Sequence, residues 1–425
     1  MAVQIYRVVF EEGQLTLRPY HVDLFRKDLT FHRQDALEDF GVSRYRTQVN
    51  NTTINMRILH ASFLALSVVG FALLWGGMAI NGTLDAINTV KAAHKFPDNT
   101  PLRNVYTHIP PLDDFLTTLT VFFYNLTNGK NAGPRLLFCD LAIILQVVVL
   151  WILAESRRGY NRSRWSIFGD IRTPALWGVM MNALGAAFIL PIYCFRHLRN
   201  DSSRRDSGLT ENEAKALPIT ILISATFPLM LMLPPILSAA TESQQGWIAL
   251  FQVTPLLFSL VQIINSLAVT SFVKKSDHNS TEKKYLKISY LLAGLIASTA
   301  HLSTLSTSVF STDPTISFAS VFLPWHTTVD QSTPTGLVMG AHLFTQFDFL
   351  IITITCSVYA YALLEPLMKR ERHIALYKQP SIFRDPMVAG MVIAGSAFFL
   401  GPAATVSFAF AMREDGVRKV VGKMR

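Results

Sequence analysis

Long stretches of this chain contain almost no charged residues, and this feature limits its possible folds more than any other. Of its 425 residues, 50% are hydrophobic and only 16% are charged, whereas an ordinary soluble domain carries about 25% charged residues. The charges are concentrated in the connections between the apolar stretches. This distribution is typical of a protein that crosses a lipid bilayer several times.

Eight of the apolar stretches are long enough to cross a bilayer. A spanning helix needs about 20 mostly apolar residues, because the hydrocarbon layer is about 30 Å thick. The sequence therefore predicts an all-α, polytopic transmembrane helical bundle of about eight spans, near residues 58–80, 135–154, 174–198, 217–239, 247–272, 286–309, 336–364 and 388–412. The last stretch contains Gly401-Pro402, which can break it into two half-helices.

The predicted domain organisation has three parts. Residues 1–55 are mixed and charged and form an extramembrane N-terminal segment, without the apolar core of a cleavable signal peptide. Residues 56–412 form the transmembrane helical domain, and residues 413–425 form a basic tail.

The segment 110–126 is apolar but too short to span, and it opens with two aspartates. We interpret it as an interfacial or re-entrant helix. Asp113 and Asp114 are expected in its first turn, where carboxylates interact favourably with the positive end of the helix.

Charge, cysteines and motifs exclude several functions. The net charge of +9 comes from basic residues beside apolar stretches, where lipid headgroups attract them, so no nucleic-acid partner is expected. The three cysteines lie within or at the edges of apolar stretches, which fits neither a disulfide framework nor a zinc site. Nucleotide-binding, metalloprotease and serine-hydrolase motifs are absent, as is an aspartate-rich diphosphate-binding motif. We predict no metal and no cofactor.

Few ionisable residues fall within the predicted spans, and each is a functional candidate because charge at membrane depth is costly. These are Asp140, His301, His342 and Asp348. Glu155 lies at the end of a span, where reaching towards the interface is a sufficient explanation.

The seventh predicted span is the most informative. His342 and Gln346 are four residues apart and share one helix face, whereas Asp348 is turned away from them. Phe344 and Phe349 interleave with these polar residues. A buried acid among aromatic rings suits protonation of an apolar substrate, because the rings can stabilise a cation that forms beside them.

Structural explanations compete with this interpretation. Asp348 can form an interhelical hydrogen bond, for instance with Asn182 or Gln262. His301, Asn182 and Tyr193 can line a wet cavity, but polar residues also hold helices together in membranes. In the loop before the span, Trp325 and His326 fit either a lid over the cavity or a capped turn with an interfacial tryptophan.

Two segments carry a resemblance to a known family: Leu190-Pro-Ile-Tyr-Cys194, and the run from Pro324-Trp325-His326 to Gly340-Ala-His342-Leu-Phe344-Thr-Gln346-Phe-Asp348. The chain resembles the integral-membrane terpene cyclases of fungal meroterpenoid pathways, in particular those of the ascochlorin and ascofuranone type. The resemblance implies metal-independent protonation of a terminal epoxide on a prenylated aromatic, followed by carbocation cyclisation, in the endoplasmic reticulum membrane.

The leading hypothesis is therefore an intramembrane cyclase whose partners are a lipophilic substrate and the bilayer. Asp348 is its expected general acid, with His342 or His326 tuning or relaying the proton. The expected substrate-binding residues are Trp325, Phe344, Phe349, Gln346, His301, Asn182 and Tyr193. The alternative is a transporter or receptor for a small lipophilic molecule. Against it, the sequence shows no inverted repeat and no matched pair of broken helices.

Overall fold

The computed structural model describes residues 5–11, 14–20, 42–158, 167–200, 209–272, 278–324, 335–374 and 385–424. The chain divides into two compact units, one of residues 1–59 and 417–425 and the other of residues 60–416. In the first unit, strands β1 (Ile5–Glu11) and β2 (Gln14–Tyr20) form an antiparallel hairpin that pairs Ile5 with Tyr20 and Glu11 with Gln14. The predicted domain boundaries stay predictions.

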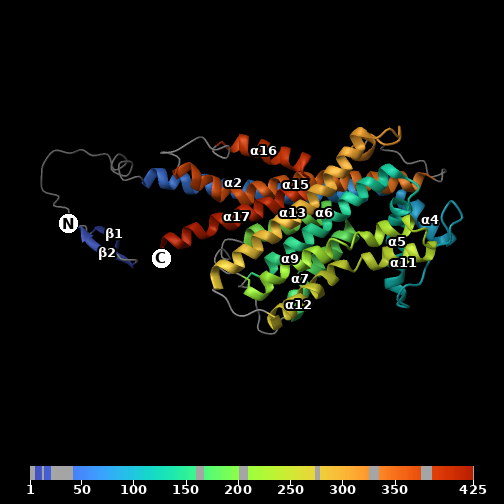
Figure 1. Ribbon diagram of the computed structural model, residues 1–425. Helices are drawn as coiled ribbons and strands as arrows, with labels where there is room; N and C mark the ends of the chain where they lie inside the picture. The colour runs from blue at the N-terminus through green and yellow to red at the C-terminus, as the bar shows by residue number, and fades with distance from the viewer. Residues whose placement is uncertain are drawn as a thin grey trace. The chain divides into compact units, whose positions relative to one another are not determined.

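The second unit is a bundle of helices, which confirms the predicted all-α membrane-type fold (Figure 1). In chain order, the described helices are α2 (Val42–Phe71), η1 (Ala72–Gly76), α3 (Gly77–Ile80), α4 (Thr83–Ala93), α5 (Pro110–Thr127), α6 (Ala132–Ser156), α7 (Ile167–Leu184), α8 (Ala186–Asn200), α9 (Glu211–Ser224), α10 (Leu229–Ile236), α11 (Thr241–Phe251), α12 (Thr254–Phe272), α13 (His278–Phe310), α14 (Phe318–Phe322), α15 (Gly336–Ile374), α16 (Pro386–Phe399) and α17 (Pro402–Met424).

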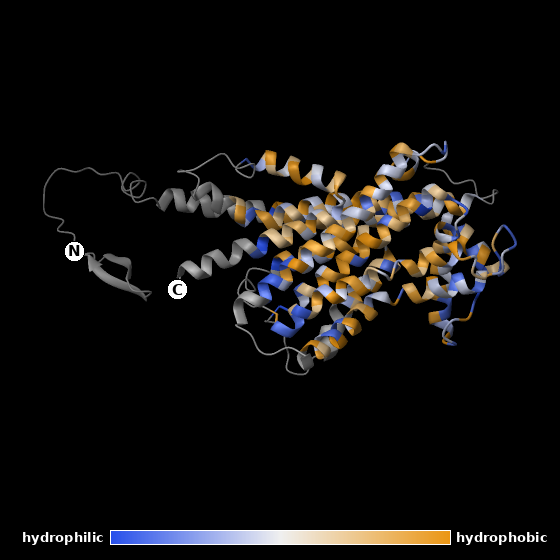
Figure 2. Ribbon diagram, viewed as in Figure 1, coloured by the Kyte–Doolittle hydropathy of each residue, from blue (hydrophilic) through white to orange (hydrophobic). Residues whose placement is uncertain are grey.

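Helix α6 lies at the centre of this bundle. Its most apolar 18-residue stretch has a mean hydropathy of 2.7 and is 83% buried, because α7, α9, α12, α13 and α15 all pack against it. A helix that is apolar on every face is stable only when it is surrounded, as this one is. Hydrophobic residues run along the bundle and hydrophilic residues gather towards its ends (Figure 2).

Five described helical segments are long and apolar enough to cross a membrane: Arg57–Ile80, Ala132–Ser156, Glu211–Ile236, Glu282–Phe310 and Gly336–Met368. A sixth exists if α11 and the following Thr254–Val269, which are bent by 65°, count as one span. The predicted count of eight is therefore not confirmed. The two predicted spans outside this set, 174–198 and 388–412, are each interrupted.

Both interruptions occur at a glycine with positive φ. Gly401, at φ +94°, separates α16 from α17, so the predicted pair of half-helices is confirmed. Gly185, at φ +88°, separates α7 from α8, a break that the sequence analysis did not predict. Pro191 lies inside α8 without ending it. Only glycine adopts this backbone conformation without steric cost.

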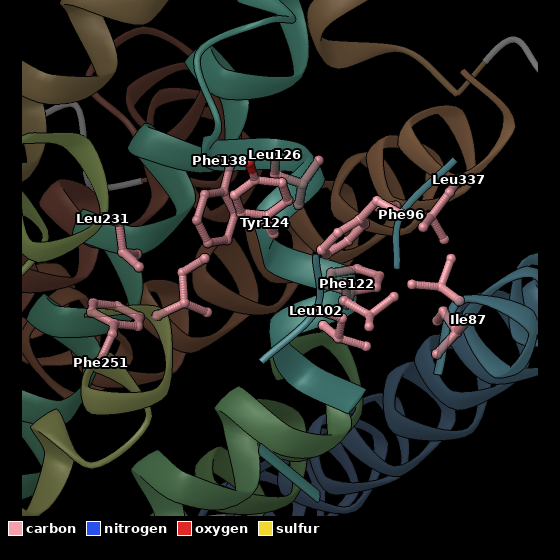
Figure 3. Close-up of a cluster of buried hydrophobic side chains, with 14 of the residues drawn as sticks. Ile87, Phe96, Leu102, Phe122, Tyr124, Leu126, Phe138, Leu231, Phe251 and Leu337 are labelled. Atoms are coloured by element: carbon pink, nitrogen blue, oxygen red, sulfur yellow. The ribbon is translucent and has the colours of Figure 1, made fainter. Parts of the chain in front are cut away.

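Helix α5 covers the predicted segment 110–126 and packs against α4, α11 and α15. It contributes Phe122 and Tyr124 to an apolar core cluster that also contains Phe96 and Phe251 (Figure 3). Asp113 lies in its first turn, as predicted. Asp114 follows that turn and pairs instead with Lys91, at 2.7 Å.

The carboxylate of Asp113 holds the loop before α5. Its Oδ1 accepts hydrogen bonds from the backbone nitrogens of Tyr106 and Thr107, at 3.0 and 2.7 Å, and from the Thr107 hydroxyl, at 2.9 Å. Burial raises the pKa of Asp113, but these hydrogen bonds outweigh it and hold the pKa below its usual value. The ionised form therefore stabilises the fold.

We expect Asp113→Asn to lower thermal stability at neutral pH. Because the folded pKa is lowered, the contribution of the carboxylate is complete above the unfolded value of about 4 and disappears as pH falls through the folded value. Thermal midpoints of the purified variant and wild type should therefore differ at pH 7 and converge below about pH 4. A difference that does not change with pH would contradict this account.

Candidate active site

Asp348 is buried on α15 and lies at the break between α7 and α8. Its Oδ1 accepts a hydrogen bond from the backbone nitrogen of Ala187, at 2.6 Å. The expected partners were wrong: Gln262 instead bonds Thr220 and the carbonyl oxygen of Glu213. The interhelical hydrogen bond thus exists, but its donor is the main chain.

The helix break explains this contact. The first N–H groups of any helix lack partners within it, and here the first turn of α8 lies inside the bundle. A carboxylate at that position accepts such a hydrogen bond and interacts favourably with the helix dipole. On the other side of the break, the Trp75 indole donates to the carbonyl oxygen of Leu184, at 2.9 Å.

Aromatic rings surround this break, as the sequence analysis expected for Asp348. A Cβ atom added at Gly185 would lie 3.2 Å from the Phe344 ring and 3.6 Å from Oδ1 of Asp348, so ring and carboxyl flank the same glycine. Trp75 and Phe347 also pack, as Phe344 does, against a small buried cluster formed by Leu74, Ala187 and Ile351. Phe349, in contrast, does not lie at this break but stacks on His301.

His342 and Gln346 share a helix face, as predicted, but they do not approach Asp348. Instead they hold the short helix α14. His342 Nε2 donates to the carbonyl oxygen of Ser320, at 2.8 Å, and Gln346 Nε2 donates to the same oxygen, at 3.0 Å. Trp325 and His326 lie outside the described residues, so their expected roles stay predictions.

A second buried acid, Asp140 of α6, pairs with His301 of α13. Asp140 Oδ2 lies 2.7 Å from His301 Nδ1, and His301 Nε2 lies 2.9 Å from the carbonyl oxygen of Phe398. Asp140 is 1% exposed and His301 is 2% exposed. Phe398 lies at the end of α16, so this contact holds the second helix break. We call these two residues the Asp140–His301 pair.

Aromatic rings also enclose the Asp140–His301 pair. The His301 ring stacks on Phe349, with centroids 5.8 Å apart and an interplanar angle of 11°. Phe322 of α14 meets both rings, with centroids 6.0 Å from His301 and 5.2 Å from Phe349. Gly401 leaves space for the imidazole, because an added Cβ would lie 2.9 Å from the Cβ of His301.

Two expected cavity residues lie elsewhere. Tyr193 stacks on His197, with centroids 5.8 Å apart, and contacts Trp177 edge-on. The side-chain nitrogen of Asn182 is buried without a hydrogen-bond partner among the described residues. Neither residue contacts the described groups around the Asp140–His301 pair.

Sequence analysis missed a buried ionic cluster around Glu155, which is 3% exposed rather than directed to the interface. The Glu155 cluster consists of Glu155, Arg158, His197, Tyr290, Arg413 and Glu414. Glu155 Oε1 accepts from Arg158 (2.9 Å), Tyr290 (2.5 Å) and Arg413 (2.7 Å). The nearness in sequence of Glu155, in the last turn of α6, and Arg158, just beyond its end, was the available signal.

The described residues hold one further candidate feature. A cleft of about 460 Å³ is lined by the loop residues 101–105 and by Glu242, away from both acids. No three His, Cys, Asp or Glu side chains in the described part of the chain gather to hold a metal ion.

Comparison with known proteins finds one matching domain family and several relatives that carry the same kind of name. A CtvD domain matches residues 59–418. Terpene cyclase DEP1 of Fusarium langsethiae is 35% identical over 83% of this chain and 98% of the relative. Terpene cyclase DEP1 of Alternaria brassicicola is 32% identical over 84% and 98%, and terpene cyclase alnG of Emericella nidulans is 27% identical over 82% and 92%. No solved structure matches the chain.

Proposed function

Because the chain belongs to the CtvD-domain family and its relatives are named terpene cyclases, we propose that it is a membrane-bound terpene cyclase that acts on the epoxidised prenyl chain of an aromatic compound. The family membership confirms the resemblance found in the sequence. Five or six helices of spanning length support membrane insertion, and the endoplasmic reticulum is the proposed location.

The proposed reaction is an isomerisation. A protein acid gives a proton to the epoxide oxygen, the carbon–oxygen bond breaks with its electron pair on oxygen, and a carbocation forms. A double bond of the prenyl chain attacks this cation and forms a new carbon–carbon bond. Loss of a proton from carbon ends the reaction, so product and substrate have the same mass.

The observation that carries this proposal is the placement of buried carboxyls beside aromatic rings. Asp348 lies beside Phe344 at one helix break, and Asp140 bonds His301, which stacks on Phe349, at the other. A carboxyl in apolar surroundings is a suitable proton donor, and aromatic faces stabilise the resulting cation. Both parts of the proposed chemistry are therefore available inside the bundle.

Membranes that contain the protein test this function directly. Incubation with a farnesylated phenol that carries a terminal epoxide should give a product of unchanged mass and altered chromatographic retention. Membranes from cells without the protein are the control, because they report spontaneous opening of the epoxide. Recovery of only unchanged epoxide from a series of such prenyl phenols would reject the proposal.

The structure also provides one observation in favour of a transporter. The sequence argument against a transporter was the lack of an inverted repeat and of a matched pair of broken helices, and the structure contains two interrupted helix pairs, α7/α8 and α16/α17. Transporters often bind substrates at such breaks. Vesicles that contain the protein distinguish the functions: a transporter accumulates the prenyl epoxide unchanged, whereas a cyclase converts it to an isomer.

A further inference from the structure

We propose that the proton that starts the cyclisation comes from the Asp140–His301 pair and not from Asp348. This inference rests on the proposed function, and it replaces the sequence-based choice of acid. It follows from the hydrogen-bond partners of the two carboxyls.

The contacts of His301 fix where protons lie. The carbonyl oxygen of Phe398 can only accept a hydrogen bond, so His301 Nε2 must carry a hydrogen. Nδ1 and Asp140 Oδ2 are 2.7 Å apart, a distance at which two lone pairs without a proton between them would repel. One labile proton therefore lies between them, whether the pair is written as imidazolium and carboxylate or as imidazole and carboxylic acid.

The second carboxyl oxygen of Asp140 provides the place where a substrate oxygen can bind. Oδ1 is buried and has no hydrogen-bond partner among the described residues. A buried carboxyl oxygen without a partner is costly, and such an atom calls for a functional explanation. The epoxide oxygen itself only accepts hydrogen bonds, but the alcohol that forms when it takes the labile proton from the neighbouring Oδ2 can donate to Oδ1 and complete the site.

The hydrogen-bond partner of Asp348 differs from that of Asp140, because it is a main-chain donor and not an imidazole. Its Oδ1 accepts from the N–H of Ala187 at the start of α8. A backbone donor and a helix N-terminus both stabilise the charged carboxylate relative to the protonated acid. Asp348 thus holds the break closed through its bonded oxygen, whereas the Asp140–His301 pair has both a labile proton and a carboxyl oxygen without a partner among the described residues.

The rings around the pair suit the cation that follows. His301, Phe322 and Phe349 are in mutual contact, so their faces and edges enclose one side of the pair. Phe322 belongs to α14, which His342 and Gln346 hold through the Ser320 carbonyl oxygen. Two of the residues expected from sequence thus act by positioning an aromatic wall.

Protons balance over the proposed cycle. The pair gives its labile proton to the epoxide oxygen, and the carbon–oxygen bond breaks to give an alcohol and a carbocation. The pair is then an imidazole beside a carboxylate, which is a base. The cyclised cation loses a proton from carbon, the pair regains one, and no other reactant is needed.

Asn substitutions at the two acids test the assignment. Asp140→Asn is expected to lower turnover of the farnesylated phenol epoxide by about 100-fold or more, the usual contribution of general acid catalysis. The loss of turnover for Asp348→Asn should be at least tenfold smaller than for Asp140→Asn, because the side-chain oxygen of asparagine can still accept the hydrogen bond from Ala187. Asp114→Asn, on an exposed carboxyl, is the unchanged control. Size-exclusion elution in detergent establishes which variants fold.

Dicyclohexylcarbodiimide tests the same assignment in the wild-type protein. This apolar reagent needs a proton and a carboxyl oxygen together, as the pair presents them. Mass spectrometry should locate the modification on Asp140, and activity should fall in parallel with it. The prenyl epoxide should slow both the modification and the loss of activity.

Three results would overturn the inference. They are a folded Asp140→Asn protein with turnover within tenfold of wild type, inactivation that follows modification of Asp348, and inactivation that leaves Asp140 unmodified. If Asp140→Asn does not fold, the site of modification decides alone. A wild-type protein that forms no isomer would reject the proposed function, whereas the site of modification would still report on the pair.

Discussion

Replacement of Gly70 by alanine is expected to destabilise the bundle by about 3 kcal/mol, the upper range for a side chain forced into a filled space. An added Cβ would lie 2.3 Å from the carbonyl oxygen of Ala187. That oxygen is part of the main chain of α8, so it can move only with the helix. Such a movement also weakens the hydrogen bond between Ala187 and Asp348.

The matched control is Gly77→Ala, a few residues along the same predicted span. An added Cβ at Gly77 meets nothing within 4 Å, and alanine has the higher helix propensity, so stability should be unchanged or slightly raised. The measurement is the thermal midpoint of each purified protein in detergent. Equal midpoints for the two variants would show that α2 and α8 are not in the close contact described.

Replacement of Glu155 by glutamine is the second substitution that we expect to lower stability strongly. The change keeps the size of the side chain but removes the charge that faces Arg158 and Arg413. Removal of one partner from a buried ion pair costs about 3–5 kcal/mol, because the remaining charge stays buried without compensation. The thermal midpoint should fall well below that of wild type.

The control for this effect is Asp114→Asn. This substitution also removes a salt bridge, the one between Asp114 and Lys91, but the side chain of Asp114 is 71% exposed. Exposed ion pairs contribute about 1 kcal/mol or less to stability. Combining Glu155→Gln with Arg413→Gln should restore part of the lost stability, since both buried charges are then absent. A double variant that loses the full sum of both single losses would indicate that the charges do not interact.

Hydropathy and helix geometry were sufficient to predict a large part of this fold. The five helices of spanning length coincide with predicted apolar stretches, and the division at Gly401-Pro402 was correct. The common face of His342 and Gln346 was also correct, because residues four apart on a helix are neighbours whatever surrounds it. These features depend on local sequence alone.

The partners of buried polar groups could not be predicted in the same way. Asp140 and His301 are 161 residues apart, as are Asp348 and Ala187. Helical periodicity gives the face on which a side chain lies but not the helix that meets this face. Glu155 was misjudged for this reason: its position at a span end fitted lipid headgroups, whereas its partners come from α8, α13 and α17.

The break at Gly185 was missed because the sequence contains a more conspicuous signal nearby. Pro191 is the residue that usually interrupts a helix, yet it lies inside α8. Gly185 turns the chain because its φ is positive and because Leu74 and Phe344 occupy the space that a side chain would need. Its role depends on tertiary contacts.

The glycine break at Gly401 has a consequence for biogenesis. Residues 388–412 contain no charged side chain, so the insertion machinery meets a segment as hydrophobic as an ordinary anchor. Once the chain turns at Gly401, main-chain groups such as the carbonyl of Phe398 become available for bonding deep in the bundle. The protein thereby acquires polarity after insertion, from its backbone, and avoids the energetic penalty that additional ionisable side chains would impose on entry into the bilayer.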